Sequence, residues 1–112
     1  MGTIHYGTDD AGISIDDETM AHVAAVVVAK LRRREPFLLT TVSAGGREAV
    51  WVHEASTLRW VYETQESIAL DKARLEAMVR ETNRPSGLAV ECLGRPLRAV
   101  STIGAAPLEV AA

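Results

Sequence analysis

The sequence predicts an α+β fold, with a mostly antiparallel sheet and two helices. Two segments have apolar residues at helical spacing after a capping aspartate, and six shorter segments have strand composition and are bounded by turn residues. Of the 112 residues, 47% are hydrophobic and 24% are charged. This size and composition are typical of one globular domain that folds without metals or disulfides. We therefore expect a single α+β domain over residues 1–93.

The N-terminal part is expected to form a hairpin followed by a helix. Residues 3–6 and 13–15 have strand composition and flank a turn-rich segment. Asp16 is suited to cap the helix, because its carboxylate can accept hydrogen bonds from free backbone N–H groups. We expect this helix to end near Arg34, since Pro36 disfavours helical backbone at the residue before it.

The rest of the domain is expected to contain four more strands and a second helix. A second capping aspartate, Asp71, begins that helix, and Pro85 and Gly87 end it. The predicted elements cover residues 37–42, 47–53, 57–63, 72–83 and 88–93. The full order is β-β-α-β-β-β-α-β, and residues 94–112 are expected to form an irregular or flexible C-terminal tail.

The second and third of these strands are expected to pair as a hairpin. If His53 lies opposite Leu58, then Trp51 lies opposite Trp60, and Tyr62 shares their face. Exposed, these rings would form a platform for stacking nucleic-acid bases. Because the chain contains only five aromatic residues, we favour core packing or a buried interface for them.

The element order can also be divided into two β-β-α-β halves. Residues 13–16 and 68–71 both lead from apolar residues into a capping aspartate, and both helices end at an arginine followed by Pro36 or Pro85. Caps and stops of this kind occur in unrelated helices. We therefore attribute the similarity of the two halves to these common helix signals, not to a duplication.

Composition points to a cytoplasmic protein that does not enter a membrane. The N-terminus lacks the charged start and apolar run of a secretory signal, and the longest apolar stretch, residues 23–29, is far shorter than the about 20 residues that cross a bilayer. Cys92 is the only cysteine, which fits a reducing compartment.

The net charge of −3 argues against nucleic-acid binding over the whole surface and leaves a local basic patch open.

No residue pattern indicates catalysis, a metal site or a cofactor. His5, His22 and His53 fall in separate elements without metal-ligand spacing, and Cys92 lies in an apolar strand without a neighbouring base. Acidic residues gather near the N-terminus at Asp9, Asp10, Asp16, Asp17 and Glu18. Turns and helix N-termini attract acids in any case, so we expect structural roles for them. The sequence therefore predicts a non-enzyme.

A basic cluster at the end of the first helix is one candidate site. It consists of Lys30, Arg32, Arg33 and Arg34. Four neighbouring cations could contact phosphates, as in a nucleic-acid-binding accessory domain. The competing interpretation is a solvated helix end whose cations stabilise the helix dipole, and the acidic net charge favours it.

The second candidate site is the side of the first helix opposite its main apolar face. It consists of Ala21, Ala25, Val26 and Ala29. A helix that is apolar nearly all round needs cover on more than one side. We therefore expect this domain to self-associate as a homodimer or to bind a partner protein, with nucleic-acid binding as the alternative.

Four segments resemble a family of short actinobacterial proteins. They are Met1–Gly7 (MGTIHYG), Lys30–Phe37 (KLRRREPF), Val50–His53 (VWVH) and Asn83–Leu88 (NRPSGL). Family members are often labelled ATP-dependent DNA ligases, although no activity or site is established for them. Such a ligase needs a lysine in a K-x-D-G setting, whereas Lys30 precedes Leu31 and Lys72 precedes Ala73 and Arg74. The resemblance therefore implies a domain of unknown function, and we do not expect ligase activity.

Overall fold

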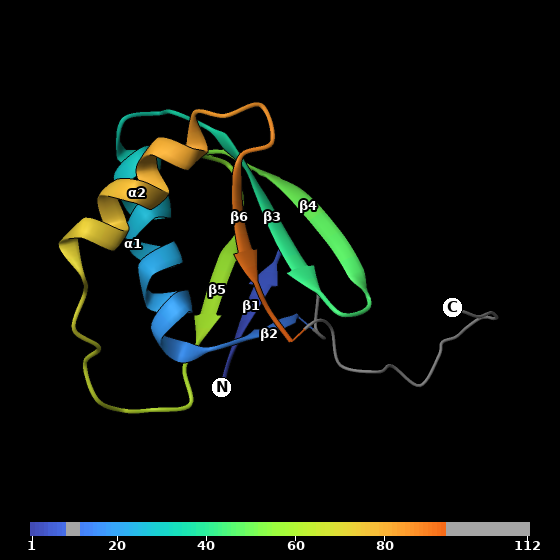
Figure 1. Cartoon of the computed structure of the whole chain (residues 1–112), viewed down its shortest axis with the longest axis vertical. Coiled ribbons are helices and arrows are strands. Elements are labelled where there is room, and N and C mark those ends of the chain that lie inside the picture. Colours follow the sequence, from blue (N-terminus) through green and yellow to red (C-terminus); the bar gives the residue numbers. More distant parts are fainter. Residues whose placement is uncertain (9–11, 94–112) are drawn as a thin grey trace, which may run out of the picture.

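The computed structural model describes residues 1–8 and 12–93, which form two three-stranded sheets with two helices on one side of them (Figure 1). In chain order the elements are β1 (Gly2–Tyr6), β2 (Ile13–Ile15), α1 (Asp17–Arg32), β3 (Phe37–Ser43), β4 (Gly46–Val52), β5 (Leu58–Val61), α2 (Lys72–Thr82) and β6 (Leu88–Glu91). The predicted α+β class and element order are confirmed. The predicted tail at residues 94–112 lies outside the described residues.

Each sheet combines strands that are distant in the sequence. One sheet has the order β2-β1-β5 and is antiparallel throughout. The other has the order β4-β3-β6, in which β3 and β4 are antiparallel and β3 and β6 are parallel. Hydrogen bonds join the sheets, among them one from Leu93 N–H to the carbonyl of Ser14 at 2.9 Å and one from the hydroxyl of Tyr6 to the carbonyl of Trp51 at 2.7 Å.

The predicted hairpin between β4 and β5 is wrong. β4 pairs with β3, so Trp51 lies opposite Leu38, whereas β5 pairs with β1, so Trp60 lies opposite Ile4. Ile4 is only 2% exposed, so this register brings Trp60 against the core, while Trp51 remains 55% exposed. The two tryptophans therefore lie in different sheets. The second β-β-α-β half lacks the hairpin of the first.

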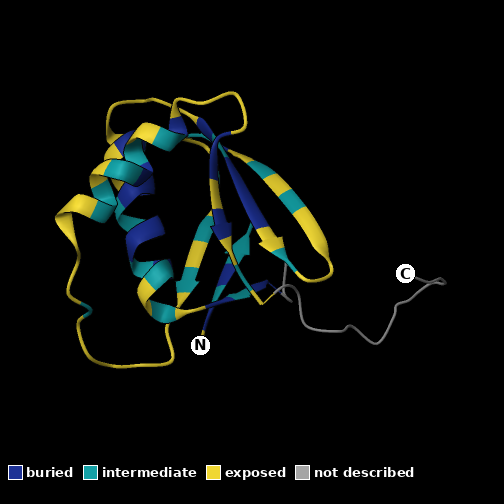
Figure 2. Ribbon diagram, in the orientation of Figure 1, coloured by how far each residue is buried: buried dark blue, intermediate teal, exposed yellow. Residues whose placement is uncertain are grey.

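The core lies between the sheets and the helices (Figure 2). It contains the buried side chains of Ile4, Ile15, Met20, Val23, Val26, Val27, Phe37, Leu39, Val52, Met78, Leu88 and Val90. Aliphatic residues dominate this set, as expected for a chain with few aromatics. Large aliphatic and aromatic side chains each stabilise the fold by about 1.5–3 kcal/mol when fully buried.

Both predicted helix caps are confirmed. The side chain of Asp16 accepts from the N–H of Thr19, and that of Asp71 accepts from the N–H groups of Ala73 and Arg74. These bonds satisfy backbone donors that have no partner inside a helix. Each aspartate therefore fixes the first residue of its helix.

Candidate functional site

One flank of α1 is covered by α2, and this decides which α1 residues reach the surface. Arg74 Nη2 lies 2.9 Å from the hydroxyl of Thr19, and Lys30 Nζ lies 3.4 Å from Asn83 Oδ1. Val26 falls on the same flank and is 1% exposed. The prediction that Val26 forms part of a surface interface is therefore wrong, because α2 and the core already cover it.

The opposite flank of α1 is open and apolar in its middle. Ala21 and Ala25 are half-buried, Ala29 is exposed, and Val28 is 46% exposed. Because 3.6 residues make one turn, these positions lie close together along one side of the helix. Val28 thus takes the place of Val26 in the predicted surface. Its spacing from Ala21 and Ala25 could have indicated this, but the sequence does not show which flank α2 occupies.

A hollow of about 440 Å³ lies beside Ala21, between α1 and the segment that joins β5 to α2. Tyr62, Ile68 and Leu70 give it apolar walls, and Tyr62 and Leu70 are 37% and 47% exposed. This segment runs away from the sheets before it reaches α2 (Figure 1). This hollow could not be predicted from the sequence, because the pattern that places Tyr62 in a strand gives no sign of the helix that Ile68 and Leu70 face.

Charged residues lie at both ends of this open flank. Glu18 lies near the start of α1, and Arg32 is its last residue. Each is seven residues from Ala25, which is the centre of the apolar stretch. Glu18 also lies 3.6 Å from Arg74, whereas Arg32 makes no ion pair within the described residues.

The predicted basic cluster is divided by the structure. Lys30 is only 7% exposed, and its ammonium lies 3.0 Å from a carboxylate oxygen of Glu35. It is therefore neutralised and cannot reach a phosphate. Arg34 is paired with Glu54 at 3.6 Å in an exposed position. Arg32 and Arg33 remain exposed, so only part of the cluster is free for a ligand.

Arginines from other elements restore the predicted basic cluster only in part. Arg84 is exposed and follows Asn83, which contacts Lys30, so it lies at the same end of the molecule as Arg32 and Arg33. Arg47 and Arg59 lie on β4 and β5, in different sheets.

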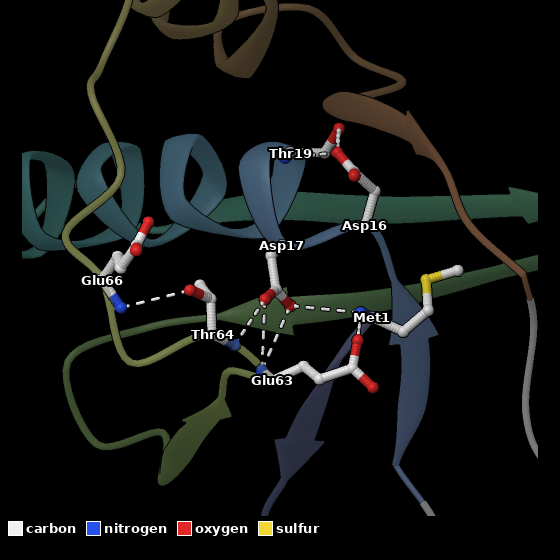
Figure 3. A network of polar contacts seen from close by, with 7 residues as sticks. All are labelled: Met1, Asp16, Asp17, Thr19, Glu63, Thr64 and Glu66. Atoms are coloured by element: carbon white, nitrogen blue, oxygen red, sulfur yellow. Dashed lines mark hydrogen bonds and ion pairs between the residues drawn. The ribbon is translucent and has the colours of Figure 1, made fainter.

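The acidic residues at the start of α1 have structural partners (Figure 3). The carboxylate of Asp17 accepts hydrogen bonds from the N–H groups of Glu63 and Thr64, both at 3.1 Å. These bonds hold the start of the segment between β5 and α2 against α1. The amino group of Met1 donates to Glu63 at 2.5 Å, and this bond raises the pKa of that amine. These contacts favour the structural role predicted for Asp17; Asp9 and Asp10 lie outside the described residues.

Histidine and cysteine do not come together into one site. His5 lies on β1, His22 on α1 and His53 in the turn after β4. Cys92 is half-buried beside a hollow of about 250 Å³ at the β3–β4 turn. Within residues 1–8 and 12–93, no three histidine, cysteine or acidic side chains are placed to hold a metal ion together.

Comparisons with known proteins identify the family. In the part of the chain that the structure describes, no helix has the length and apolarity needed to span a membrane. No curated protein and no solved structure matches the chain. One family profile, described as "Domain of unknown function (DUF7882)", matches residues 1–92. This match covers most of the chain, and the chain therefore belongs to that family of domains of unknown function.

Proposed function

We propose that this domain is a non-catalytic cytoplasmic module that forms a homodimer through the open flank of α1. The observation that carries the proposal is the arrangement of that flank about Ala25. Small residues lie four positions to either side of it, at Ala21 and Ala29, and opposite charges lie seven positions to either side, at Glu18 and Arg32.

This arrangement is complementary to itself when two α1 helices pack antiparallel. A two-fold axis at Ala25 brings Ala21 of one copy next to Ala29 of the other, and Glu18 next to Arg32. Alanines let the two helix backbones approach closely, and the charge pairs fix the direction of packing. A single flank thus supplies both halves of the contact.

The hollow beside Ala21 fits this packing. Val28 lies three residues from the axis, so in the second copy it faces the part of α1 next to Ala21. Its side chain would enter the hollow lined by Tyr62, Ile68 and Leu70. Burying these exposed apolar groups gives the dimer a driving force of about 25 cal/mol per Å² of apolar surface.

The positions of the titratable side chains support the non-catalytic part of the proposal. His22 has both ring nitrogens within hydrogen-bond distance of backbone atoms, and the carboxylates of Asp16 and Asp17 accept backbone N–H groups. A reducing compartment agrees with Cys92 as the only cysteine.

Sedimentation equilibrium of the full chain at tens of micromolar tests the dimer. Glu18→Arg and Arg32→Glu each place like charges together and should weaken association, whereas the double variant restores opposite charges and should restore the dimer. Ala25→Glu on the axis should give monomers, and Ala44→Glu in the exposed β3–β4 turn is the matched control. A monomer under all conditions, or a double variant weaker than both single ones, contradicts the proposal.

A second candidate function is nucleic-acid binding at the end where α1 and α2 stop. The observation in its favour is that Arg32, Arg33 and Arg84 are exposed there together. The expected result is binding to a DNA or RNA oligonucleotide that weakens steeply with salt. Arg33→Ala and Arg84→Ala should weaken it while leaving the dimer intact, which separates the two functions. No binding at low salt rejects this candidate.

A further inference from the structure

β6 is an edge strand with an unpaired side. The sheet order places β3 on one side of it only. Cys92 N–H bonds to the carbonyl of Val42 on β3, whereas Leu93 N–H points the other way and bonds to Ser14. By this alternation the backbone groups of Ala89 and Glu91 also point away from β3. Within the described residues, those N–H and C=O groups have no partner.

A groove runs along this open side, between β6 and α2. Its volume is about 330 Å³. Leu88, Val90 and Met78 give it a buried apolar floor, and Ala77 and Ala89 form low walls. Figure 1 shows α2 next to the upper part of β6. The groove thus combines an open strand edge with an apolar helix surface.

The charges along the groove are mainly acidic. Glu81 on α2 and Glu91 on β6 line it. The one cation among the described lining residues, Arg74, is already occupied: it donates to the hydroxyl of Thr19 and lies 3.6 Å from Glu18. The unbalanced charge is therefore negative and favours a basic ligand.

We infer that this groove binds an extended basic segment of a partner protein, which adds a strand to β6. Backbone groups of the segment bond to Ala89 and Glu91. Apolar side chains on one face rest on Met78 and Ala77, basic side chains on the other face lie beside Glu91, and Glu81 adds to the negative charge of the groove. Strand addition to an open edge next to a helix is a recurring mode of peptide recognition. A second copy does not fit the same place, because two β6 strands would bring like charges together.

This inference uses a different surface from the proposed dimer. The groove lies between α2 and β6, with Thr19 of α1 at its edge, whereas the dimer uses the opposite flank of α1. The dimer variant Arg32→Glu should therefore bind the peptide as the unchanged protein does.

The test is an NMR titration of the full chain, labelled with ¹⁵N. The probe is a nine-residue peptide that alternates valine with lysine, acetylated and amidated at its ends. We expect saturable shifts of the amides of Ala77, Ala89 and Glu91. The same peptide with glutamate in place of lysine should bind at least about fivefold more weakly. N-methylation of alternate peptide amides should abolish binding, since it removes ladder donors and leaves the side chains.

Two sets of variants locate the contact. Ala89→Pro removes an N–H that points into the groove and should abolish binding, whereas Ala49→Pro does the same at the edge of β4 and should leave binding unchanged. Glu81→Lys with Glu91→Lys should weaken the lysine peptide by about tenfold or more, and Glu76→Lys on the exposed face of α2 is its control. Far-ultraviolet circular dichroism and unfolding curves establish that each variant is folded.

The inference is overturned by a lack of saturable binding at millimolar peptide, by equal binding of the lysine and glutamate peptides, or by equal effects of the two proline substitutions. Shifts centred on β4 instead of β6 would likewise reject the groove as the site.

Discussion

The Nε2 atom of His22 accepts a hydrogen bond from the backbone N–H of Asp71 at 2.9 Å. The other ring nitrogen, Nδ1, lies 2.7 Å from the carbonyl oxygen of Glu18 on the preceding turn of α1. Since Nε2 accepts, the neutral ring carries its proton on Nδ1 and donates it to Glu18. Asp71 is the N-cap of α2, so one imidazole fixes the start of the second helix against the middle of the first.

Replacing this imidazole should destabilise the domain. His22 is 1% exposed, so His22→Ala leaves a cavity and removes both bonds. We expect a loss of about 2–4 kcal/mol in the free energy of unfolding, measured by urea denaturation. His53→Ala is the control, because the half-buried His53 ring accepts a hydrogen bond from Ala55 N–H in the turn after β4, and the loss of this bond should cost less than about 1 kcal/mol. Similar losses for the two variants would contradict the linking role of His22.

The capping carboxylate of Asp16 should make stability depend on pH. Hydrogen bonds from the N–H and hydroxyl of Thr19 lower the pKa of Asp16 below its ordinary value of 3.8. A lowered folded-state pKa stabilises the fold above the unfolded-state pKa, and this contribution is lost as pH falls through the folded-state value. Asp16→Ala should cost about 1 kcal/mol at pH 7 and progressively less below pH 3.8. Asp16→Asn keeps an acceptor and should cost less at pH 7; a constant difference across pH would exclude this role.

Lys30 and Arg33 should respond differently to truncation although they are three residues apart. Lys30→Ala removes a buried side chain that contacts Glu35 and Asn83, and should cost about 1–3 kcal/mol. Arg33→Ala removes an exposed side chain without an ion pair in the described structure and should change stability by less than about 0.5 kcal/mol. Thermal unfolding of both variants checks this. Equal effects would mean that Lys30 is a surface residue like its neighbour.

Gly87 should not tolerate a side chain, whereas Gly45 should. The φ angle of Gly87 is +74°, and an added Cβ would collide with the carbonyl of Leu38. Gly87→Ala should therefore cost at least about 2 kcal/mol. At Gly45 the nearest atom is 4.0 Å from an added Cβ, so Gly45→Ala should be neutral or stabilise by up to about 1 kcal/mol. Urea midpoints of the pair provide the comparison, and a mild effect at Gly87 would contradict the close approach.

Arg34 occupies a backbone conformation that favours glycine. Its φ angle is +59°, and its N–H and that of Glu35 bond to the carbonyls of Leu31 and Lys30, both at 3.0 Å, as at a helix end with a left-handed residue. Arg34→Gly should raise the free energy of unfolding by about 0.5–1 kcal/mol, because the exposed pair with Glu54 contributes little. Arg33→Gly, at φ −95°, should give no such gain. A lower melting temperature for Arg34→Gly would show that the ion pair dominates.

Local signals in the sequence predicted most of the fold. Asp16 and Asp71 marked the starts of the helices, and Pro36 marked the end of the first, because caps and stops act within a few residues. The strand partners could not be predicted in this way. Trp60 joins the core only when β5 pairs with β1, and that choice depends on distant residues such as Ile4.

The candidate site was predicted only in part, because burial of its residues also depends on distant parts of the chain. Ala21 and Ala29 reach the surface, but Val26 does not, since a helix that is apolar all round does not show where a second helix packs. Lys30 belongs to a basic run in the sequence, yet its side chain is covered by neighbouring parts of the fold, and Glu35 neutralises it. The groove at β6 left no local signal, because it depends on the parallel pairing of β6 with β3.

The crossed pairing of strands makes the two halves of the chain depend on each other. β5 completes the sheet begun by β1, and β6 completes the sheet begun by β3. A cut in the turn between β4 and β5 would leave two fragments, neither of which holds a complete sheet. Each fragment would present an open edge that only the other fragment matches, so the pair is suited to serve as a split protein that regains its fold when two fused partners bring the pieces together.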